Sequence, residues 1–369
     1  MTKKLKVGVI FGGKSGEHEV SVQSAKSVME SLDPTKYTIV PIGISKEGSW
    51  YVGDDALPLL QTNTLSSTPE LGETNFSNKV ENGQTNSAVP SSFTNEIDVV
   101  IPVMHGTFGE DGSIQGMLEL LGVPYVGAGI LASAVGLDKV FMKTVFLAAG
   151  LPQVLFTSYN RKEWEKNREG VIQDVEEKLG YPCFVKPANL GSSVGISKAK
   201  NRTDLYTAMD LACRFDRKII VEEGLNVREI EVAVLGNDEP KASVPGEVVP
   251  SHEFYDYEAK YMSGDSTLTI PAHLSAEQTT EIQDLAVRAF QAVDCTGLAR
   301  VDFFIETDTD RILVNEINTM PGFTVFSMYP KLWEATGIPY AELVDTLINL
   351  AIERYEDKQK IVYDFRSNQ

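Results

Sequence analysis

The chain has 369 residues, 42% of them hydrophobic, and its 33 Lys and Arg against 52 Asp and Glu give a formal charge of -19. This length exceeds one ordinary core and predicts two or three domains of about 100–150 residues each. The acidic balance repels phosphate backbones and anionic membrane surfaces, so we expect neither nucleic acid nor a membrane as a partner.

The first third of the chain predicts an open α/β sheet. Apolar, β-rich runs at 5–11, 37–44 and 97–103 predict strands, and a helical pattern follows the first of them at 20–32. Strands that end in glycine and lead into a helix place a binding site at their carboxyl ends. Between 55 and 95 the periodic pattern gives way to Ser, Thr, Asn, Gln, Pro and Gly. We interpret this stretch as a surface insertion without chemistry.

Two further blocks of helices and strands follow. From 128 to 226 we expect helices at 138–149, 161–179 and 203–215, and strands at 153–156, 183–186 and 218–221. Asp138 is the expected N-cap of the first helix. From 227 to 369 we expect strands at 229–235, 298–305 and 312–317, and helices at 277–293 and 340–353.

Cysteine usage and hydropathy indicate the compartment. Cys183, Cys213 and Cys295 are odd in number and widely separated. That pattern fits neither a disulfide framework nor a zinc site and favours buried thiols in a reducing compartment. The apolar run at 7–11 is too short for a signal-peptide core, and no apolar stretch approaches the ~20 residues that span a bilayer. We therefore expect a cytoplasmic protein.

A lysine followed by a loop of small residues predicts a phosphate site. The strand at 183–186 ends in Lys186, and Gly191, Ser192, Ser193 and Gly195 follow. Such residues let backbone N–H groups crowd around phosphate oxygens while the lysine supplies a positive charge. The order differs from a Walker loop, in which the lysine follows the glycines. The alternative interpretation is an ordinary hairpin with a solvated lysine.

Acidic residues on two strands predict a metal site. Residues two apart on a strand share a face, so Arg300 points with Asp302, and Glu316 points with Asn318. Two carboxylates and an amide oxygen form an all-oxygen site that suits Mg²⁺ carrying a nucleotide. Surface salt bridges are the alternative, which the apolar residues around these positions disfavour because unpaired polar groups would be costly there.

These residues resemble the ATP-grasp superfamily and, within it, the D-alanine–D-alanine ligase family. Six signatures occur in that family's order and cover nearly the whole chain apart from 55–95; they lie at 11–21, 105–112, 137–139, 183–196, 255–261 and 316–322. The resemblance implies three α/β domains, with an open α/β domain at 1–127 and two ATP-grasp subdomains at 128–226 and 227–369. It also implies ATP between the second and third domains, and a homodimer.

The resemblance further implies which residues hold ATP and metal. The residues expected to bind ATP are Lys139, Lys186 and Ser193 at the phosphates, Glu222, Glu223 and Leu225 around the adenine, and Glu229 at the ribose. The residues expected to bind two Mg²⁺ or Mn²⁺ ions are Asp302, Glu316 and Asn318. These ions would bridge the phosphates and offset charge in the transition state.

The family's reaction has two steps. The carboxylate of the first D-alanine attacks the γ-phosphate of ATP, and the amine of the second D-alanine then attacks the acyl phosphate. By resemblance, Glu17 anchors the first ammonium, His105 lies near the first carboxylate, and Ser327 binds the second carboxylate. Arg300 and the N–H of Gly322 would stabilise the oxyanion of the second step.

The segment 255–261 resembles the family's lid, which would keep water from the acyl phosphate. Lys260 would reach the γ-phosphate, while Tyr261 would bond to Ser192 and Ser192 to Glu17. Relatives that make D-alanyl-D-lactate have another residue type, often histidine, in this lid. Tyr261 therefore predicts dipeptide synthesis, whereas D-serine remains open as a second substrate because one hydroxyl is a weak discriminant.

Three other interpretations compete with this one. Another ATP-grasp carboxylate–amine ligase would share the nucleotide half but need not have the signatures at 17–21 and 257–261. A nucleotide-binding protein without catalysis would have no need of both metal ligands and Arg300. A Rossmann dehydrogenase rests only on Gly12 and Gly13 after the first strand, without the G-x-G-x-x-G spacing.

Overall fold

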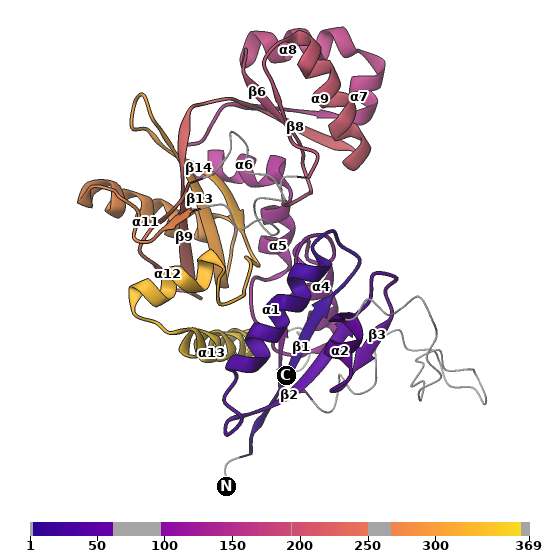
Figure 1. Ribbon diagram of the computed structural model, residues 1–369, viewed down its shortest axis with the longest axis vertical. Coiled ribbons are helices and arrows are strands. Elements are labelled where there is room, and N and C mark those ends of the chain that lie inside the picture. The colour runs from indigo at the N-terminus through magenta and orange to yellow at the C-terminus, as the bar shows by residue number, and fades with distance from the viewer. Residues whose placement is uncertain (1–2, 62–96, 193, 250–266, 363–369) are drawn as a thin grey trace, which may run out of the picture.

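The computed structural model describes residues 3–61, 97–192, 194–249 and 267–362. Within these ranges the chain forms three sheets, stacked along the long axis of the molecule with helices packed against each (Figure 1). No helix in the described ranges is long and apolar enough to cross a membrane.

The N-terminal sheet has the order β3-β2-β1-β4. Strand β1 lies parallel to both β2 and β4, whereas β3 is antiparallel to β2. Its elements are β1 (Leu5–Gly12), α1 (His18–Ser31), β2 (Tyr37–Ile44), β3 (Trp50–Val52), α2 (Ala56–Gln61), β4 (Val99–Pro102) and α4 (Ser113–Leu121). The parallel strands bring the loops after β1 and β4 to the same edge, which faces the other two sheets.

The second sheet is antiparallel, in the order β5-β8-β6-β7, and three helices cover it. Its elements are β5 (Phe156–Asn160), α7 (Arg161–Lys166), α8 (Arg168–Lys178), β6 (Cys183–Pro187), β7 (Ser197–Ala199), α9 (Arg202–Phe215) and β8 (Lys218–Glu223). Trp164, Val185 and Ile219 belong to a core of its own, so this sheet is a compact unit carried above the rest (Figure 1).

The third sheet has the order β12-β11-β9-β13-β14, and β10 pairs with β9. Its strands are β9 (Val227–Gly236), β10 (Lys241–Ala242), β11 (Gly246–Val249), β12 (Thr267–Thr269), β13 (Gly297–Glu306) and β14 (Ile312–Asn318). The helices around it are α5 (Ile130–Leu137), α6 (Lys139–Ala148), α11 (Ala276–Ala292), α12 (Met328–Thr336) and α13 (Tyr340–Lys358).

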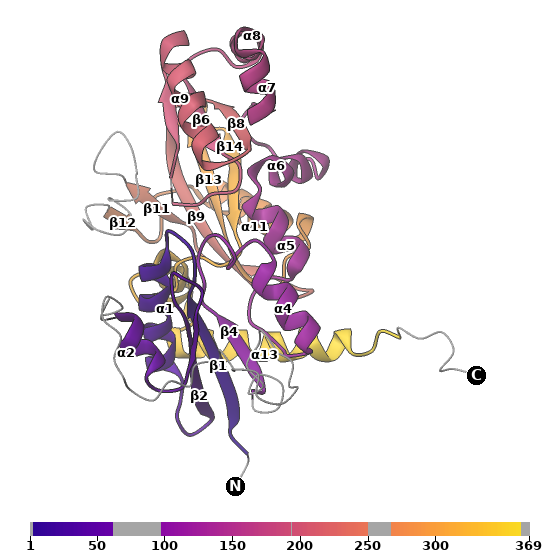
Figure 2. The same ribbon diagram turned by 90° about the vertical axis from the view of Figure 1, so that its right-hand side faces the viewer.

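Alternation along β13 separates its two faces. Ala299, Val301 and Phe303 belong to a core with α5, α6 and α11. Leu298, on the opposite face, joins a core that includes α12, α13 and the N-terminal sheet. Figure 2 shows α13 running across the region of β1 and β4. Arg300, on the same face as Leu298, is therefore directed toward the region where the sheets meet.

Most elements predicted from the sequence are present. The strands predicted at 5–11, 37–44 and 298–305 correspond to β1, β2 and β13, and the helix predicted at 138–149 corresponds to α6. Asp138 caps α6 as expected, because its side chain accepts hydrogen bonds from the N–H groups of Val140 and Phe141.

Three predicted boundaries were wrong. The strand predicted at 153–156 begins only at Phe156. Before it, the carbonyl of Pro152 accepts from the N–H of Val314, and the N–H of Leu155 donates to the side chain of Glu223, so no regular strand pairing forms there. The helix predicted at 161–179 breaks at Asn167, which has φ -146 and caps α8 through the N–H of Gly170. The stretch at 55–95 opens with α2, two of whose residues are buried, and its part at 62–95 lies outside the described residues.

Candidate active site

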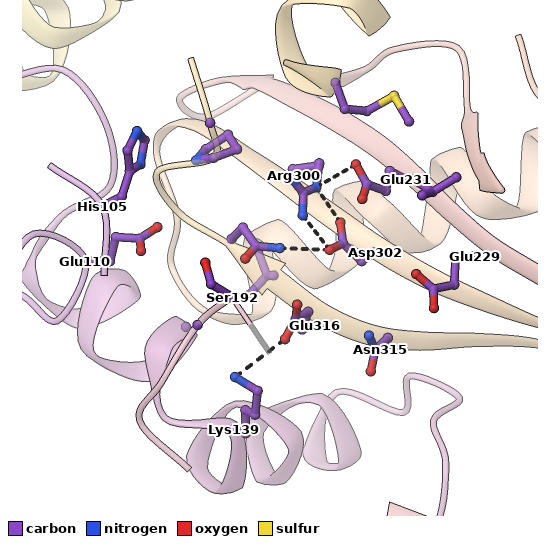
Figure 3. Close-up of a pocket in the computed structure, with 18 of the residues that line it drawn as sticks. His105, Glu110, Lys139, Ser192, Glu229, Glu231, Arg300, Asp302, Asn315 and Glu316 are labelled. Carbon is purple, nitrogen blue, oxygen red and sulfur yellow. Dashed lines mark hydrogen bonds and ion pairs between the residues drawn. The ribbon is translucent and has the colours of Figure 1, made fainter. Parts of the chain in front are cut away.

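A cavity of about 650 Å³ lies where the three sheets meet. Its walls come from the start of α1, the loop after β4, the start of α6, the strands β6, β8, β9, β13 and β14, and the loop that leads to α12. Figure 3 shows side chains from the loop after β4, α6, the loop after β6 and strands β9, β13 and β14 around one space. The cavity is large enough for a nucleotide with a small substrate beside it.

Two lysines form the basic part of the cavity. Lys139 is the first residue of α6, and its Nζ donates to the carbonyl of Leu190 at 2.8 Å. Lys186 on β6 lies 2.6 Å from Oε2 of Glu222. Burial opposes the charge of Lys186, but Glu222 outweighs it and raises the pKa of that lysine. Both lysines line the cavity, where ammonium groups suit phosphate oxygens.

An apolar slot adjoins these lysines. Among its lining residues are Val154, Phe184, Ile196 and Leu225. Glu222 on β8 is 2% exposed and lines the slot with its carboxylate. Burial opposes ionisation of Glu222, but Lys143 and Lys186 outweigh it and lower its pKa. Its Oε1 is buried without a hydrogen bond and lies 3.4 Å from Nζ of Lys143, so an unsatisfied acceptor lies in the wall of the slot.

Glu223 and Glu229, two further acidic residues expected to bind ATP, also line the cavity. Oε1 of Glu223 accepts a hydrogen bond from the N–H of Leu155 at 2.8 Å, which fastens the segment before β5. Glu223 lines the cavity next to Glu222, but its Oε1 is engaged by the backbone of Leu155. Glu229 lies on β9, lines the cavity, and pairs in register with Phe304 (Figure 3).

Strands β13 and β14 bring the predicted metal ligands together. In the register, Asp302 pairs with Glu316 and Arg300 with Asn318. The amide of Asn318 donates to Oδ2 of Asp302 at 2.9 Å, and Glu316 lies 3.6 Å from Nζ of Lys139. The shared faces expected from the period of a strand are therefore confirmed.

This donor set fits a divalent cation of the Mg²⁺ type, because it is made of carboxylate and amide oxygens on two paired strands. Within the described ranges, no group of three or more His, Cys, Asp or Glu side chains gathers closely enough to hold a metal by itself. The amide oxygen of Asn318 and the oxygens of a bound molecule are needed to complete the coordination.

Arg300 is held by two carboxylates. Its Nε and Nη2 donate to Asp302 at 2.7 and 2.8 Å, and its Nε lies 2.9 Å from Oε2 of Glu231 (Figure 3). Burial works against its charge, but Asp302 and Glu231 outweigh burial and keep the pKa of Arg300 well above its usual value. Sequence reasoning missed Glu231, whose only signal was its place two residues after Glu229 on the same strand face.

The N-terminal sheet contributes Glu17, which precedes α1. The hydroxyl of Ser192 donates to the carboxylate of Glu17, as expected from the sequence. Ser192 has φ 51, a left-handed conformation that aims its side chain across the cavity mouth. A Cβ on Gly106 would lie 2.6 Å from Oε2 of Glu17, so only glycine lets the loop after β4 approach this carboxylate.

His105 is a buried, neutral histidine. Its Nδ1 lies 3.0 Å from the carbonyl oxygen of Met320, and its Nε2 lies 3.0 Å from the hydroxyl of Ser24. A carbonyl can only accept, so Nδ1 carries the proton and Nε2 accepts from the serine. Burial lowers the pKa of His105. The ring therefore fastens the loop after β14 to α1 while it lines the cavity.

Glu110 lies beside Glu17 and was named in the sequence only as part of a motif. Its Oε2 accepts a hydrogen bond from the N–H of Gly106 at 2.6 Å. Burial, together with the nearby charge of Glu17, raises the pKa of Glu110 to about 8. A sequence gives no sign of this pairing, because the two residues meet only through the parallel arrangement of β1 and β4.

The loop after β14 carries Gly322 and Ser327. Oγ of Ser327 accepts from the N–H of Thr324 at 3.1 Å, and both residues line the cavity. A Cβ on Gly322 would lie 3.1 Å from Oγ of Ser327, so a side chain there would crowd that hydroxyl. Three other predicted site residues, Ser193, Lys260 and Tyr261, lie outside the described residues.

A cavity between two antiparallel sheets, with Lys186 on one, paired acidic strands on the other and Lys139 at the start of α6, defines an ATP-grasp enzyme with an additional open α/β sheet at its N-terminus. Two family models match the chain: the D-ala D-ala ligase N-terminus over residues 6–128 and the D-ala D-ala ligase C-terminus over residues 145–349. The chain belongs to the D-alanine–D-alanine ligase family.

Individual relatives agree with this assignment. The chain is 51% identical over 370 residues to a D-alanine–D-alanine ligase of Heliobacterium modesticaldum, covering 97% of each chain. The solved structure of the D-alanine–D-alanine ligase from Coxiella burnetii is 39% identical with a TM-score of 0.79, covering 97% of this chain and 98% of that one. The VanG D-Ala:D-Ser ligase of Enterococcus faecalis is 36% identical with a TM-score of 0.78, covering 95% and 100%.

Proposed function

We propose that this chain joins two D-alanine molecules into D-alanyl-D-alanine with ATP as the energy source, a step of peptidoglycan precursor synthesis. The observation that carries the proposal is the cavity itself. It places a basic pair, an acidic pair of strands and the linked residues Ser192 and Glu17 around one space. Its family membership supports the same reaction.

In this proposal, ATP occupies the part of the cavity between the second and third sheets. The adenine lies in the apolar slot, and its amino group donates to the carboxylate of Glu222. Lys139 and Lys186 hold the phosphates, and Glu229 accepts from the ribose hydroxyls. Ser193 belongs to the same phosphate loop by resemblance.

Asp302, Glu316 and Asn318 would hold two Mg²⁺ or Mn²⁺ ions. Such ions supply charge neutralisation at the phosphate oxygens during phosphoryl transfer. The chain itself supplies Lys139 beside Glu316 and Arg300 beside Asp302, which balance the negative charge of the ligands. This arrangement keeps positive charge next to the transferred group.

The first D-alanine would lie beside Glu17, which pairs with its ammonium and so directs its carboxylate toward the phosphates. Glu17 is itself oriented by Ser192, and the floor of this subsite is fixed by His105. Attack of the carboxylate on the γ-phosphate gives an acyl phosphate and ADP. Fixing both partners in line removes most of the entropic barrier to this step.

The second D-alanine would lie against the loop after β14, with its carboxylate at Ser327. Its neutral amine attacks the acyl carbon and loses a proton as the bond from that carbon to the phosphate oxygen breaks, so the amide forms and inorganic phosphate leaves. Arg300 and the N–H of Gly322 would stabilise the tetrahedral oxyanion. Arg300 is suited to this role because two carboxylates hold it in one orientation before substrate arrives.

Several finer features belong to the proposal through the resemblance alone. These are three domains at 1–127, 128–226 and 227–369, a homodimer in the cytoplasm, and a lid at 255–261. In that lid Lys260 reaches the γ-phosphate and Tyr261 bonds to Ser192. A neutral phenol tolerates the ammonium of D-alanine, so Tyr261 favours a dipeptide over D-alanyl-D-lactate.

Mass spectrometry of the product tests the proposal. Purified protein is incubated with ATP, Mg²⁺ and D-alanine, with D-lactate and D-serine as competitors. We expect D-alanyl-D-alanine with one ADP released per dipeptide. ADP accompanied by a different product would agree with an ATP-dependent ligase but would overturn the proposed specificity for D-alanine. If that product were D-alanyl-D-serine, the specificity would match the neighbour named a D-Ala:D-Ser ligase. No ADP with any of the three acceptors would contradict a ligase.

A further inference from the structure

Lys143 is a buried lysine behind the nucleotide slot. It lies four residues after Lys139 on α6, which places both on one side of the helix. Lys139 lines the cavity, whereas Lys143 is 1% exposed and lies outside the cavity lining. Its Nζ donates to the carbonyl of Asn315 at 3.2 Å. A lysine without contact to solvent requires a specific partner, because burying an unpaired charge is costly.

That partner is Glu222, which two lysines share. Nζ of Lys143 lies 3.4 Å from Oε1 of Glu222, and Nζ of Lys186 lies 2.6 Å from Oε2. Each carboxylate oxygen therefore has its own lysine. The contact of Lys143 is an ion pair without a hydrogen bond, since Oε1 has no hydrogen-bond partner.

The two lysines differ in what else they can reach. Lys186 lines the cavity in which the phosphates of the proposed nucleotide would lie. Lys143 is enclosed by α6 and β14 and has Glu222 and the Asn315 carbonyl as partners. If Lys186 turned to the phosphates without Lys143 in place, Glu222 would become a buried carboxylate with no counter-ion, which is strongly unfavourable.

We propose that Lys143 is a positioning residue for ATP that acts as the permanent counter-ion of Glu222 and so releases Lys186 from that carboxylate to the phosphates. The inference rests on the proposed function, because it requires ATP in this cavity. Lys143 has no contact with ATP in this scheme. It lowers the free energy needed to move the ammonium of Lys186 from Glu222 to the phosphates. Glu222 meanwhile keeps a counter-ion and stays ionised next to the adenine.

Comparing ATP with adenosine tests this scheme, because adenosine makes the contacts of the base and ribose but offers no phosphate to Lys186. Dissociation constants of both ligands are measured by calorimetry, with Mg²⁺ present, for the wild type and for Lys143→Met. Methionine keeps most of the volume and removes the charge. We expect ATP binding to weaken about 10-fold to 100-fold and adenosine binding to change less than about 3-fold.

A second variant restores the balance. In Lys143→Met/Glu222→Gln the amide needs no counter-ion, so Lys186 is free again. We expect its ratio of ATP affinity to adenosine affinity to return to within about 3-fold of the wild type. Such recovery would show that the substitutions at Lys143 and Glu222 are coupled, because the effects of independent sites simply add. Lys162→Met on the exposed side of α7 is the matched control and should leave both affinities unchanged. Thermal unfolding checks that each variant is folded.

The outcomes separate this inference from the proposed function. Equal losses of ATP and adenosine affinity in Lys143→Met, or no recovery in the double variant, would overturn the role of Lys143 while the wild type still releases ADP with D-alanine. A wild type that binds neither ligand would overturn the proposed function itself. Selective loss for ATP together with recovery in the double variant supports the inference.

Discussion

The hydroxyl of Ser192 donates a hydrogen bond to the carboxylate of Glu17, which joins the glycine loop after β6 to the N-terminal sheet. The two residues are 175 positions apart, and both line the cavity. A carboxylate held from one side presents its remaining lone pairs to the other, where the ammonium of an amino acid would lie. The contact therefore links the glycine loop after β6 to the proposed subsite for the first D-alanine.

Ser192→Ala tests this link. Loss of the hydroxyl leaves Glu17 charged but free to rotate, so the anchor for the first D-alanine is less well ordered. We expect the KM for D-alanine to rise about 10-fold, which is close to the lower end of the roughly 1.5–3 kcal/mol for a hydrogen bond to a charged group, while the KM for ATP changes little. Steady-state ADP release at varied D-alanine gives both values.

Ser27→Ala provides the comparison, since Ser27 is a partly exposed serine on α1 whose hydroxyl donates to the carbonyl of Gln23 in the same helix. It should behave as the wild type. If Ser192→Ala raised the KM for ATP as much as that for D-alanine, the serine would act on the phosphate loop and not through Glu17.

Asp302→Asn tests the metal site. The substitution removes one negative charge from a pair of strands where Arg300 and Asn318 both donate to this carboxylate. We expect the rate of ADP release to fall about 100-fold and the Mg²⁺ concentration needed for half-maximal activity to rise, because a metal ligand is lost. Titration of Mn²⁺ by electron paramagnetic resonance measures metal binding separately from turnover.

Asp308→Asn is the control for that experiment, because Asp308 is exposed in the turn between β13 and β14. Its metal titration should match the wild type. Unaltered Mn²⁺ binding in Asp302→Asn would assign Asp302 to the orientation of Arg300 alone.

Much of this acidic site could be predicted from the sequence, because it depends on short-range geometry. Arg300 and Asp302 are two apart on one strand, and the period of a strand places them together wherever the sheet lies. Asp138 was likewise predictable as an N-cap, since capping depends on the adjacent backbone. Local rules of this kind need no knowledge of tertiary structure.

The remaining contacts depend on which distant elements pack together. Glu231 reaches Arg300 only because β9 pairs with β13 across some 70 positions of sequence, as the register of Asp302 with Glu231 shows. Lys143 has the spacing of a helix face, yet its burial depends on the packing of α6 against β14. The break at Asn167 was missed because a charged helix and two short capped helices have similar composition.

Glu110→Gln tests the raised pKa beside Glu17. The pKa of Glu110 rises from 4.5 to about 8, so between these pH values the folded chain binds a proton that the unfolded chain has lost. The free energy of unfolding of the wild type therefore falls as pH rises through this window. Glutamine stays neutral and can still accept from the N–H of Gly106. The variant should gain on the order of 3–4 kcal/mol over the wild type between pH 5 and pH 8, since each pH unit inside the window is worth about 1.4 kcal/mol.

Urea unfolding at the two pH values measures that difference. Glu281→Gln, at an exposed position of α11, supplies the reference for removing a charge from this acidic chain. A difference between Glu110→Gln and the wild type that stayed constant with pH would mean that Glu110 ionises normally.

Arg354 on α13 holds the N-terminal sheet against the third sheet. Its guanidinium donates to the carbonyl of Gly127, to the carbonyl of Tyr125 at 2.8 Å and to the hydroxyl of Thr296 at 2.7 Å. It also lies 4.3 Å from the centre of the Tyr125 ring. Arg354→Met removes donors from two carbonyl groups that precede α5, where the chain leaves the N-terminal sheet.

We expect Arg354→Met to lower the free energy of unfolding by about 2–3 kcal/mol, since partly buried carbonyls lose a charged donor. Arg288→Met is the matched control: Arg288 also donates to two carbonyls, those of Ala149 and Gly150, but at 3.5 and 3.4 Å on an exposed side chain. That loss should stay within about 0.5 kcal/mol. Because Arg354 lies away from the cavity lining, ADP release by the folded variant at low temperature should equal that of the wild type. A loss of turnover without a loss of stability would instead mean that this contact sets the position of Glu17 relative to the phosphates.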